Sequence, residues 1–339
     1  MVQLTIDFLL KPKSIDNYFY IKWQSRYEPD EYPFFCSKVE TKICYGFLNR
    51  LLHLPFILVG DVKKRRDKLQ NKIEYEDIEY ENVHFLKSHL QKCIRRCETS
   101  LAIQTARHLI DLDPVQFLRR LSIIIVEDTI ITKHYSVLIW LLIAVSSNRL
   151  VLGLNHKEWL LGLVYVVSEG RKKDRYVGYP VGLSDEKLAK YVVSEMVGIE
   201  REKYAVIMSL IIRASYGGMS GDMTMLLRAA YVWMKRFTGD YKDEYYNIEL
   251  RTISYSVYPL QKGEWLLSAI DFHCFPKMIV WIVENNEMDE QEVKRLIWHC
   301  SSKINAREKN SMSEGDRLSW MKIRKNVESI AKYAISKFS

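Results

Sequence analysis

The spacing of apolar residues from about Val83 to the C-terminus constrains the fold more than any other feature of the chain. Apolar side chains recur there at intervals of three and four residues, which is the period of an amphipathic α-helix. Pro and Gly number only 8 and 14 among 339 residues, so short connections are expected. The pattern predicts helices at 84–97, 99–112, 114–131, 135–147, 159–168, 185–197, 200–215, 222–237, 264–283, 289–303 and 317–338.

The predicted helix at 135–147 is apolar on nearly all sides, which is typical of a helix at the centre of a core. Its unbroken apolar run, Val137–Val145, is far shorter than the roughly 20 residues that cross a bilayer. We therefore expect no membrane contact. No repeat of fixed period is visible, so a solenoid is not predicted.

The first 80 or so residues follow a different pattern. Apolar and polar residues alternate between 2 and 10, as in a β-strand, and a basic run at 63–68 and an acidic run at 74–81 look like a connector. We predict a mainly α protein with a small mixed α/β region at its N-terminus. The expected domains are 1–82, a helical bundle at 83–170 and a C-terminal helical region at 171–339.

Charge and cysteine usage narrow the functional classes. Fifty Lys and Arg against 42 Asp and Glu give a net charge of +8 and favour a polyanionic partner. Six scattered cysteines without a secretory signal predict reduced thiols in an intracellular protein. Phosphate-binding glycine loops, zinc-binding pairs and nucleophile elbows are all missing from the sequence. We therefore expect no cofactor or metal and favour a non-catalytic role.

The segment Gln3–Lys13 carries a candidate docking peptide. It resembles the sliding-clamp-binding peptide, the PCNA-interacting-protein box, in which Gln is followed by a spaced aliphatic residue and an aromatic pair. Gln3 and Ile6 fit, whereas Leu9 and Leu10 replace the aromatics, which should weaken binding. The resemblance implies that Gln3, Ile6, Leu9 and Leu10 contact a PCNA-type clamp through one helical turn. A plain β-strand explains the same residues.

A second resemblance lies between residues 87 and 128. It is carried by Gln91, Lys92, Ile94, Arg95, Arg96, Arg119, Arg120, Leu121, Glu127 and Asp128. The order of these residues along the predicted helices is similar to that in the helical collar of clamp-loader-type AAA+ proteins of the Mgs/RarA kind. The ATPase module is missing, so ATP hydrolysis is not implied. The resemblance implies a setting in DNA replication or repair, a clamp-loader-like bundle at 83–170 and a contact between copies of the chain. An ordinary helical bundle remains the alternative.

Basic residues form two dyads on predicted helices and two runs in predicted loops. Such clusters contact phosphates without reading sequence, although they also occur on ordinary solvated surface. The candidate nucleic-acid-binding residues are Lys63, Lys64, Arg65, Arg66, Arg95, Arg96, Arg119, Arg120, Arg171, Lys172 and Lys173.

A His-Cys pair occurs twice near the C-terminus, at His273-Cys274 and His299-Cys300. With Asp271, the two histidines have the side chains that bind a metal or transfer protons. Adjacent helical residues point about 100° apart, so one pair rarely supplies two ligands. A metal-assisted hydrolase or nuclease using Asp271, His273 and His299 is one alternative, and a polar network between helices is the other.

Several weak signals agree on one setting. We therefore expect a non-catalytic accessory protein of DNA replication or repair that contacts a sliding clamp, DNA or both, in a nucleus or at a viral replication site. A metal-assisted enzyme and a helical protein–protein interaction factor remain the alternatives.

Overall fold

The structure is a computed structural model, and it describes part of the chain. Near the N-terminus it describes the backbone of the strands at 4–7, 18–23, 37–41 and 56–60. From residue 82 it describes the chain to residue 338, except for residues 147–149, 171–172, 175–179, 240–244, 252, 254–259, 261–263, 267–275 and 302–311.

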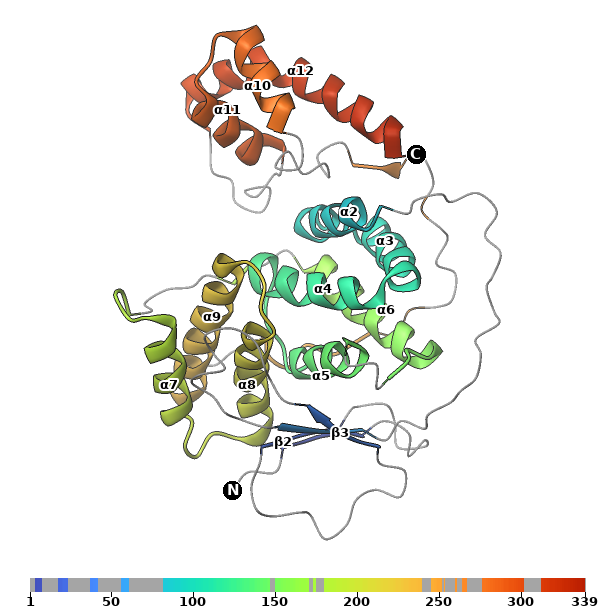
Figure 1. Cartoon of the computed structure of the whole chain (residues 1–339), viewed down its shortest axis with the longest axis vertical. Coiled ribbons are helices and arrows are strands. Elements are labelled where there is room, and N and C mark those ends of the chain that lie inside the picture. The colour runs from blue at the N-terminus through green and yellow to red at the C-terminus, as the bar shows by residue number, and fades with distance from the viewer. Residues whose placement is uncertain are drawn as a thin grey trace. The chain divides into compact units, whose positions relative to one another are not determined.

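The protein is mainly α-helical, as predicted (Figure 1). The helices are α2 (Val83–Arg96), α3 (Thr99–Leu112), α4 (Pro114–Asp128), α5 (Tyr135–Ser146), α6 (Leu154–Glu169), α7 (Asp185–Ser194), α8 (Arg201–Ser215), α9 (Ser220–Thr238), α10 (Pro276–Asn286), α11 (Glu290–Leu296) and α12 (Glu314–Phe338), with a π-helical turn, η4 (Ile297–Ser301), after α11. Among the described residues, no helix is long and apolar enough to cross a membrane.

One predicted helix differs from the structure at its start. The apolar spacing predicts a helix over 264–283, but Trp265 and Leu266 are not helical, and residues 267–275 lie outside the described residues. Helix α10 covers Pro276–Asn286, and proline suits the first position of a helix. In addition, the backbone N–H of Leu266 donates to His89 Nε2 at 3.1 Å, so this amide is engaged by a side chain of α2.

The four strands form one antiparallel sheet with the order β1-β2-β4-β3. Its strands are β1 (Leu4–Asp7), β2 (Tyr18–Trp23), β3 (Ser37–Thr41) and β4 (Phe56–Gly60). Leu4 is opposite Ile21, and Phe19 is opposite Gly60.

The chain divides into two compact units built from alternating segments. Unit 1 contains residues 1–72, 121–156 and 174–249, and unit 2 contains residues 73–120, 157–173 and 250–339. The three consecutive ranges expected from the sequence are therefore distributed over both units.

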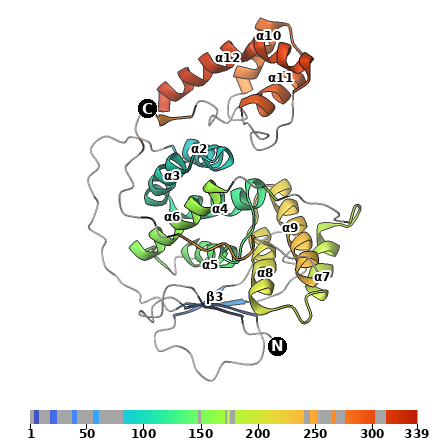
Figure 2. The ribbon, with the colours of Figure 1, turned by 180° about the vertical axis from the view of Figure 1, so that it is seen from behind.

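The core of unit 1 includes α5, whose residues Tyr135 to Val145 are all buried. The expectation of a central, apolar helix is confirmed. A buried polar network holds its first residue, because the Tyr135 hydroxyl donates to the Ser122 carbonyl at 3.1 Å and Arg213 Nε donates to Ser122 Oγ at 3.0 Å. Helices α7, α8 and α9 lie side by side in the same unit (Figures 1 and 2).

In unit 2, a backbone segment crosses α6 at a glycine. A Cβ placed on Gly162 would lie 2.7 Å from the Arg251 carbonyl oxygen, well inside contact distance. The Arg251 guanidinium also donates to Tyr165 and Glu169 on the same helix, both at 3.3 Å. Glycine at this position therefore permits the close approach of the two backbones.

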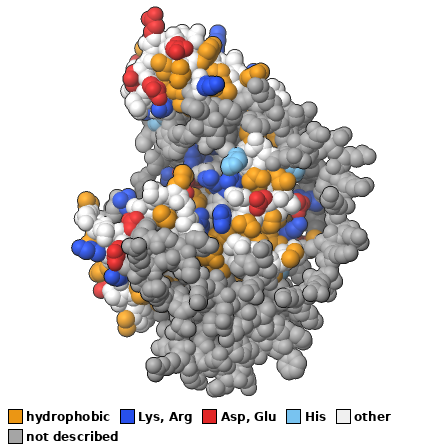
Figure 3. All heavy atoms as spheres, viewed as in Figure 1, with side chains coloured by type: hydrophobic (Ala, Val, Ile, Leu, Met, Phe, Trp, Pro, Cys, Tyr) orange, Lys and Arg blue, Asp and Glu red, His pale blue; other side chains and the backbone are white. Residues whose placement is uncertain are grey.

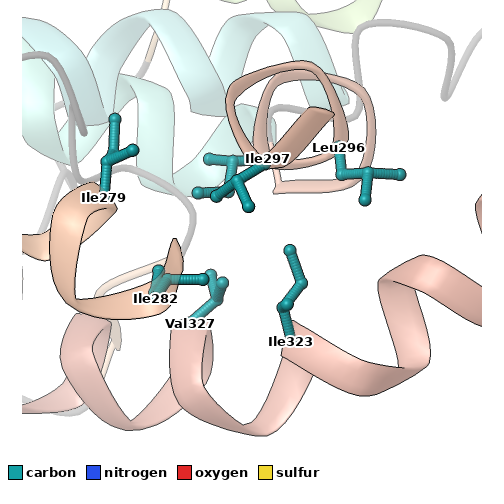
Figure 4. Packing of buried hydrophobic residues seen from close by; sticks show 7 residues of the cluster. Ile279, Ile282, Leu296, Ile297, Ile323 and Val327 are labelled. Atoms are coloured by element: carbon teal, nitrogen blue, oxygen red, sulfur yellow. The ribbon is translucent and has the colours of Figure 1, made fainter. Parts of the chain in front are cut away.

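Helices α10, α11 and α12 have a hydrophobic cluster of their own (Figure 4). Ile282 of α10 points toward Val327 of α12, and Ile323 of α12 points toward Leu296 and Ile297 at the end of α11; Ile279 belongs to the same buried cluster. The three helices therefore pack around one shared apolar core.

Candidate nucleic-acid interface

Helix α2 is strongly basic. It carries Lys87, Lys92, Arg95 and Arg96 and contains neither Asp nor Glu. The Asn82 side chain accepts from the Phe85 N–H at its start, and the two arginines lie in the last turn. Cations there interact favourably with the helix dipole. The sequence thus forms a stable helix and concentrates positive charge on it.

Helix α4 runs beside α2 in the same direction. Lys87 Nζ donates to Gln116 Oε1 at 2.9 Å, and Arg120 NH1 donates to Gln91 Oε1 at 3.3 Å. On each helix the second residue lies four positions after the first, so the two contacts stack one helical turn apart. These residues all belong to unit 2. They define the α2–α4 surface, formed by Lys87, Gln91, Lys92, Gln116, Arg119 and Arg120.

Exposure differs between the arginine dyads. Arg119 is exposed and Arg120 is half-buried, so both side chains are accessible to solvent on the α2–α4 surface. Arg95 is only 3% exposed, and Arg96 is half-buried with a pKa lowered mainly by burial. Because neighbouring helical residues point in different directions, Arg95 does not belong to the solvent-facing stripe that the sequence predicts.

Residues 83–120 carry seven Lys and Arg against three Asp and Glu, a net charge of +4, which is half of the chain's +8. Two of these acids have defined partners: Asp111 is paired with Lys157, and Asp113 Oδ1 accepts from the Gln116 N–H. Figure 3 shows Lys and Arg side chains in the region of α2 and α4. The segment therefore presents positive potential of the kind that attracts a polyanion.

The two predicted basic loops are mostly outside the described residues. This applies to Lys63, Lys64, Arg65, Arg66, Arg171 and Lys172. Lys173 is described and exposed. Sequence reasoning did not select Lys87 or Lys92 as binding residues, although the lack of any acidic residue between 83 and 96 was a usable signal.

His89 and Cys93 lie beneath the basic face of α2, fully buried. The Leu266 N–H donates to His89 Nε2, so the proton is on Nδ1, which donates to Thr105 Oγ1 at 2.8 Å. Burial lowers the pKa of His89 to about 3 and raises that of the Cys93 thiol. A buried protonated thiol beside a neutral, fully bonded imidazole is not an activated nucleophile, so this pair is structural.

The predicted metal or catalytic set is only partly described. Asp271 and His273 lie outside the described residues, and His299 lies on η4. The neighbouring Cys300 contacts Met312 Sδ at 3.5 Å, and burial raises its pKa to about 11. Within the part of the chain that the structure describes, no group of three His, Cys, Asp or Glu side chains is placed to hold a metal ion.

The candidate clamp-binding peptide is described only in part. Ile6 belongs to β1 and is opposite Phe19 of β2, as strand alternation predicts. Gln3, Leu9 and Leu10 lie outside the described residues. The clamp-binding interpretation stays a prediction, and it requires β1 to leave the sheet and form a helical turn.

Comparison with known proteins finds no matching family model, no matching curated protein and no matching solved structure.

Proposed function

We propose that this protein is a non-catalytic, nucleic-acid-binding accessory factor of DNA replication or repair. The observation that supports it is the α2–α4 surface, where two parallel helices combine Lys87, Lys92, Arg119 and Arg120 with two glutamine amides. Ammonium and guanidinium groups bind phosphate oxygens, and amide groups donate to them as well. Such a surface follows a nucleic-acid backbone and carries little sequence information.

Salt dependence tests this proposal directly. Full-length protein is titrated against a fluorescent DNA duplex between about 50 and 200 mM salt, because each phosphate contact contributes about −0.9 to the slope of log affinity against log salt. The double variant Lys92→Gln/Arg119→Gln should make the slope less negative by about 1.8. The variant Lys322→Gln/Lys325→Gln is the matched control, since it removes two exposed charges of α12.

Three outcomes separate the possibilities. A reduced slope in the α2–α4 variant alone supports the proposal. Equal changes in both double variants indicate that only the net charge of the chain matters. No binding at low salt contradicts the proposal outright.

The proposal includes a sliding clamp as a second partner, in a nucleus or at a viral replication site. Gln3 and Ile6 support this contact by their spacing. Removal of residues 1–13 should abolish binding to a PCNA-type clamp and leave DNA binding unchanged. Clamp binding by the shortened chain would contradict this part of the proposal, and so would its absence in the full-length chain.

A further inference from the structure

Helices α7 and α9 in unit 1 place two tyrosines beside one lysine. Lys235 Nζ donates to the Tyr191 hydroxyl at 3.1 Å. It also lies 5.5 Å from the ring centroid of Tyr191 and 5.8 Å from that of Tyr231. The two ring centroids are 6.0 Å apart with the planes tilted by 36°. The cluster is at the surface, because Lys235 is exposed and both rings are only half-buried.

The two helices run in the same direction, which extends this cluster into a line. Thr224 Oγ1 donates to Asp185 Oδ2 at 2.7 Å near the start of both helices, and the Lys235–Tyr191 contact follows further along each. Lys187 precedes Tyr191 by one turn, and Arg228 precedes Tyr231 by nearly one turn. Both cations are exposed. We call the surface formed by Lys187, Tyr191, Arg228, Tyr231 and Lys235 the α7–α9 face.

Lys187, Arg228 and Lys235 are the cations of this face, and Glu186, which is next to Lys187, is paired with Lys190. Asp185 is bonded to Thr224, and Glu195 is the carboxylate that acts on Lys235. Lys235 is a cation at neutral pH like any exposed lysine, and the hydrogen bond to Tyr191 raises its pKa further. Leu188, Ala189 and Val192 of α7 are buried, which holds the helix in place.

We propose that the α7–α9 face binds single-stranded nucleic acid, with an unpaired base stacked on Tyr191 or Tyr231 and Lys235 at the adjacent phosphate. This inference rests on the proposed function and names its preferred substrate class. Aromatic rings interleaved with cations are the usual platform for single strands. A paired base inside a duplex has both faces covered by its neighbours, so the rings discriminate between the two forms.

The position of Lys235 over the two rings does not prevent a base from stacking on them. An exposed cation–π contact is weak, about 0.5–1 kcal/mol, and the Lys235 side chain is flexible and exposed. A base therefore displaces the ammonium from a ring face, and the same ammonium then pairs with the phosphate of that nucleotide. A single nucleotide therefore contacts both a tyrosine ring, through its base, and the Lys235 ammonium, through its phosphate.

The experiment compares a single-stranded oligonucleotide with a duplex of the same length, using the full-length chain and fluorescence anisotropy. The variant Tyr191→Leu/Tyr231→Leu should weaken single-strand binding about tenfold or more, because stacking contributes about 1–3 kcal/mol per base. Its duplex binding should stay within about twofold of the original. Lys235→Gln should make the single-strand salt slope less negative by about 0.7.

Tyr165→Leu is the matched control. Tyr165 is another half-buried tyrosine on a helix, with the Arg251 guanidinium 5.7 Å from its ring centroid. Tyr165 belongs to unit 2, whereas all residues of the α7–α9 face belong to unit 1. Far-UV circular dichroism on all variants confirms that each is folded.

Selective loss of single-strand binding in the double tyrosine variant supports the inference. Equal losses for both nucleic acids, no loss, or the same loss in Tyr165→Leu overturn it. If Lys92→Gln/Arg119→Gln still changes the duplex salt slope in those cases, the proposed function stands without this face. If the tyrosine effect is present and the α2–α4 variant has no effect, the inference stands and the α2–α4 surface is rejected.

Discussion

Lowering the pH should destabilise unit 2 through one buried imidazole. His89 is fully buried in α2 and neutral, with both ring nitrogens bonded. Burial, assisted by the positive charge of Arg96, lowers its pKa from 6.5 to about 3. The unfolded chain binds a proton at this histidine more readily than the folded chain does. Its contribution to stability is therefore complete above pH 6.5 and is lost as the pH falls from 6.5 toward 3.

The size of the effect follows from the two pKa values. At about pH 5 the unfolded imidazole is almost fully protonated, whereas the folded one remains neutral. The difference of about 1.5 pH units from 6.5 corresponds to about 2 kcal/mol in the free energy of unfolding. That is a large share of the 5–15 kcal/mol typical of a folded domain.

Urea unfolding at about pH 7.5 and about pH 5 measures this loss. The variant His89→Gln is the comparison, because its amide can accept from the Leu266 N–H and donate to Thr105 without titrating. Its own loss between the two pH values should be about 2 kcal/mol smaller than that of the original chain. The other ionisable groups are the same in both proteins, so their contributions to the pH dependence of the unfolding free energy cancel in the comparison. Equal pH dependence in the two chains would show that His89 does not cause this loss of stability.

Two further substitutions test the packing. Gly162→Ala brings a methyl group against the Arg251 carbonyl, where the neighbour is backbone, and should cost about 1–3 kcal/mol of unfolding free energy in urea. Asp174→Asn removes the negative charge of a side chain that is only 4% exposed and is paired with Arg236. It should cost about 3 kcal/mol, since it leaves a largely buried guanidinium without its counter-charge, and thermal unfolding measures that loss.

Each of these variants has a control of the same chemistry. Gly170→Ala places its methyl at 3.6 Å from the nearest backbone atom, an ordinary contact, and should be close to neutral. Glu290→Gln breaks an exposed pair with Lys294 one turn away, which contributes about 0.5 kcal/mol. Losses in the controls as large as those in Gly162→Ala or Asp174→Asn would contradict the packing argument.

Most helices follow from the sequence because their apolar faces are continuous. Helix α3 has the bounds predicted for it, and α5 is buried on all sides as its composition requires. The helix predicted over 264–283 differs from the structure at residues 265 and 266, which are not helical. Leu266 gives its N–H to His89, which is 177 positions earlier in the chain. Local periodicity contains no information about such a partner.

The candidate surfaces were predictable to different degrees. The charge of α2 is visible in the sequence, and so are the dyads at Arg95 and Arg119. That Arg95 is buried while Arg119 is exposed depends on which neighbours cover each helix. The Tyr191–Lys235 contact joins residues 44 positions apart. Only the packing of α7 on α9 brings them together.

The buried polar contacts give both candidate surfaces a rigid base. His89 lies between Lys87 and Gln91 in α2, and its bonds to Thr105 and Leu266 fix that helix against the rest of unit 2. In unit 1, Arg236 follows Lys235 directly and is bonded through both terminal nitrogens to Asp174. Trp233 also donates to that carboxylate at 3.1 Å. In each unit, the interior side of a helix is fixed by charge-assisted or neutral hydrogen bonds, so the cations on its outer side are presented from an ordered backbone. Binding at a pre-ordered surface costs less conformational entropy than binding that must first order the contacting residues, which supports helices α2 and α9 as elements of the two proposed surfaces.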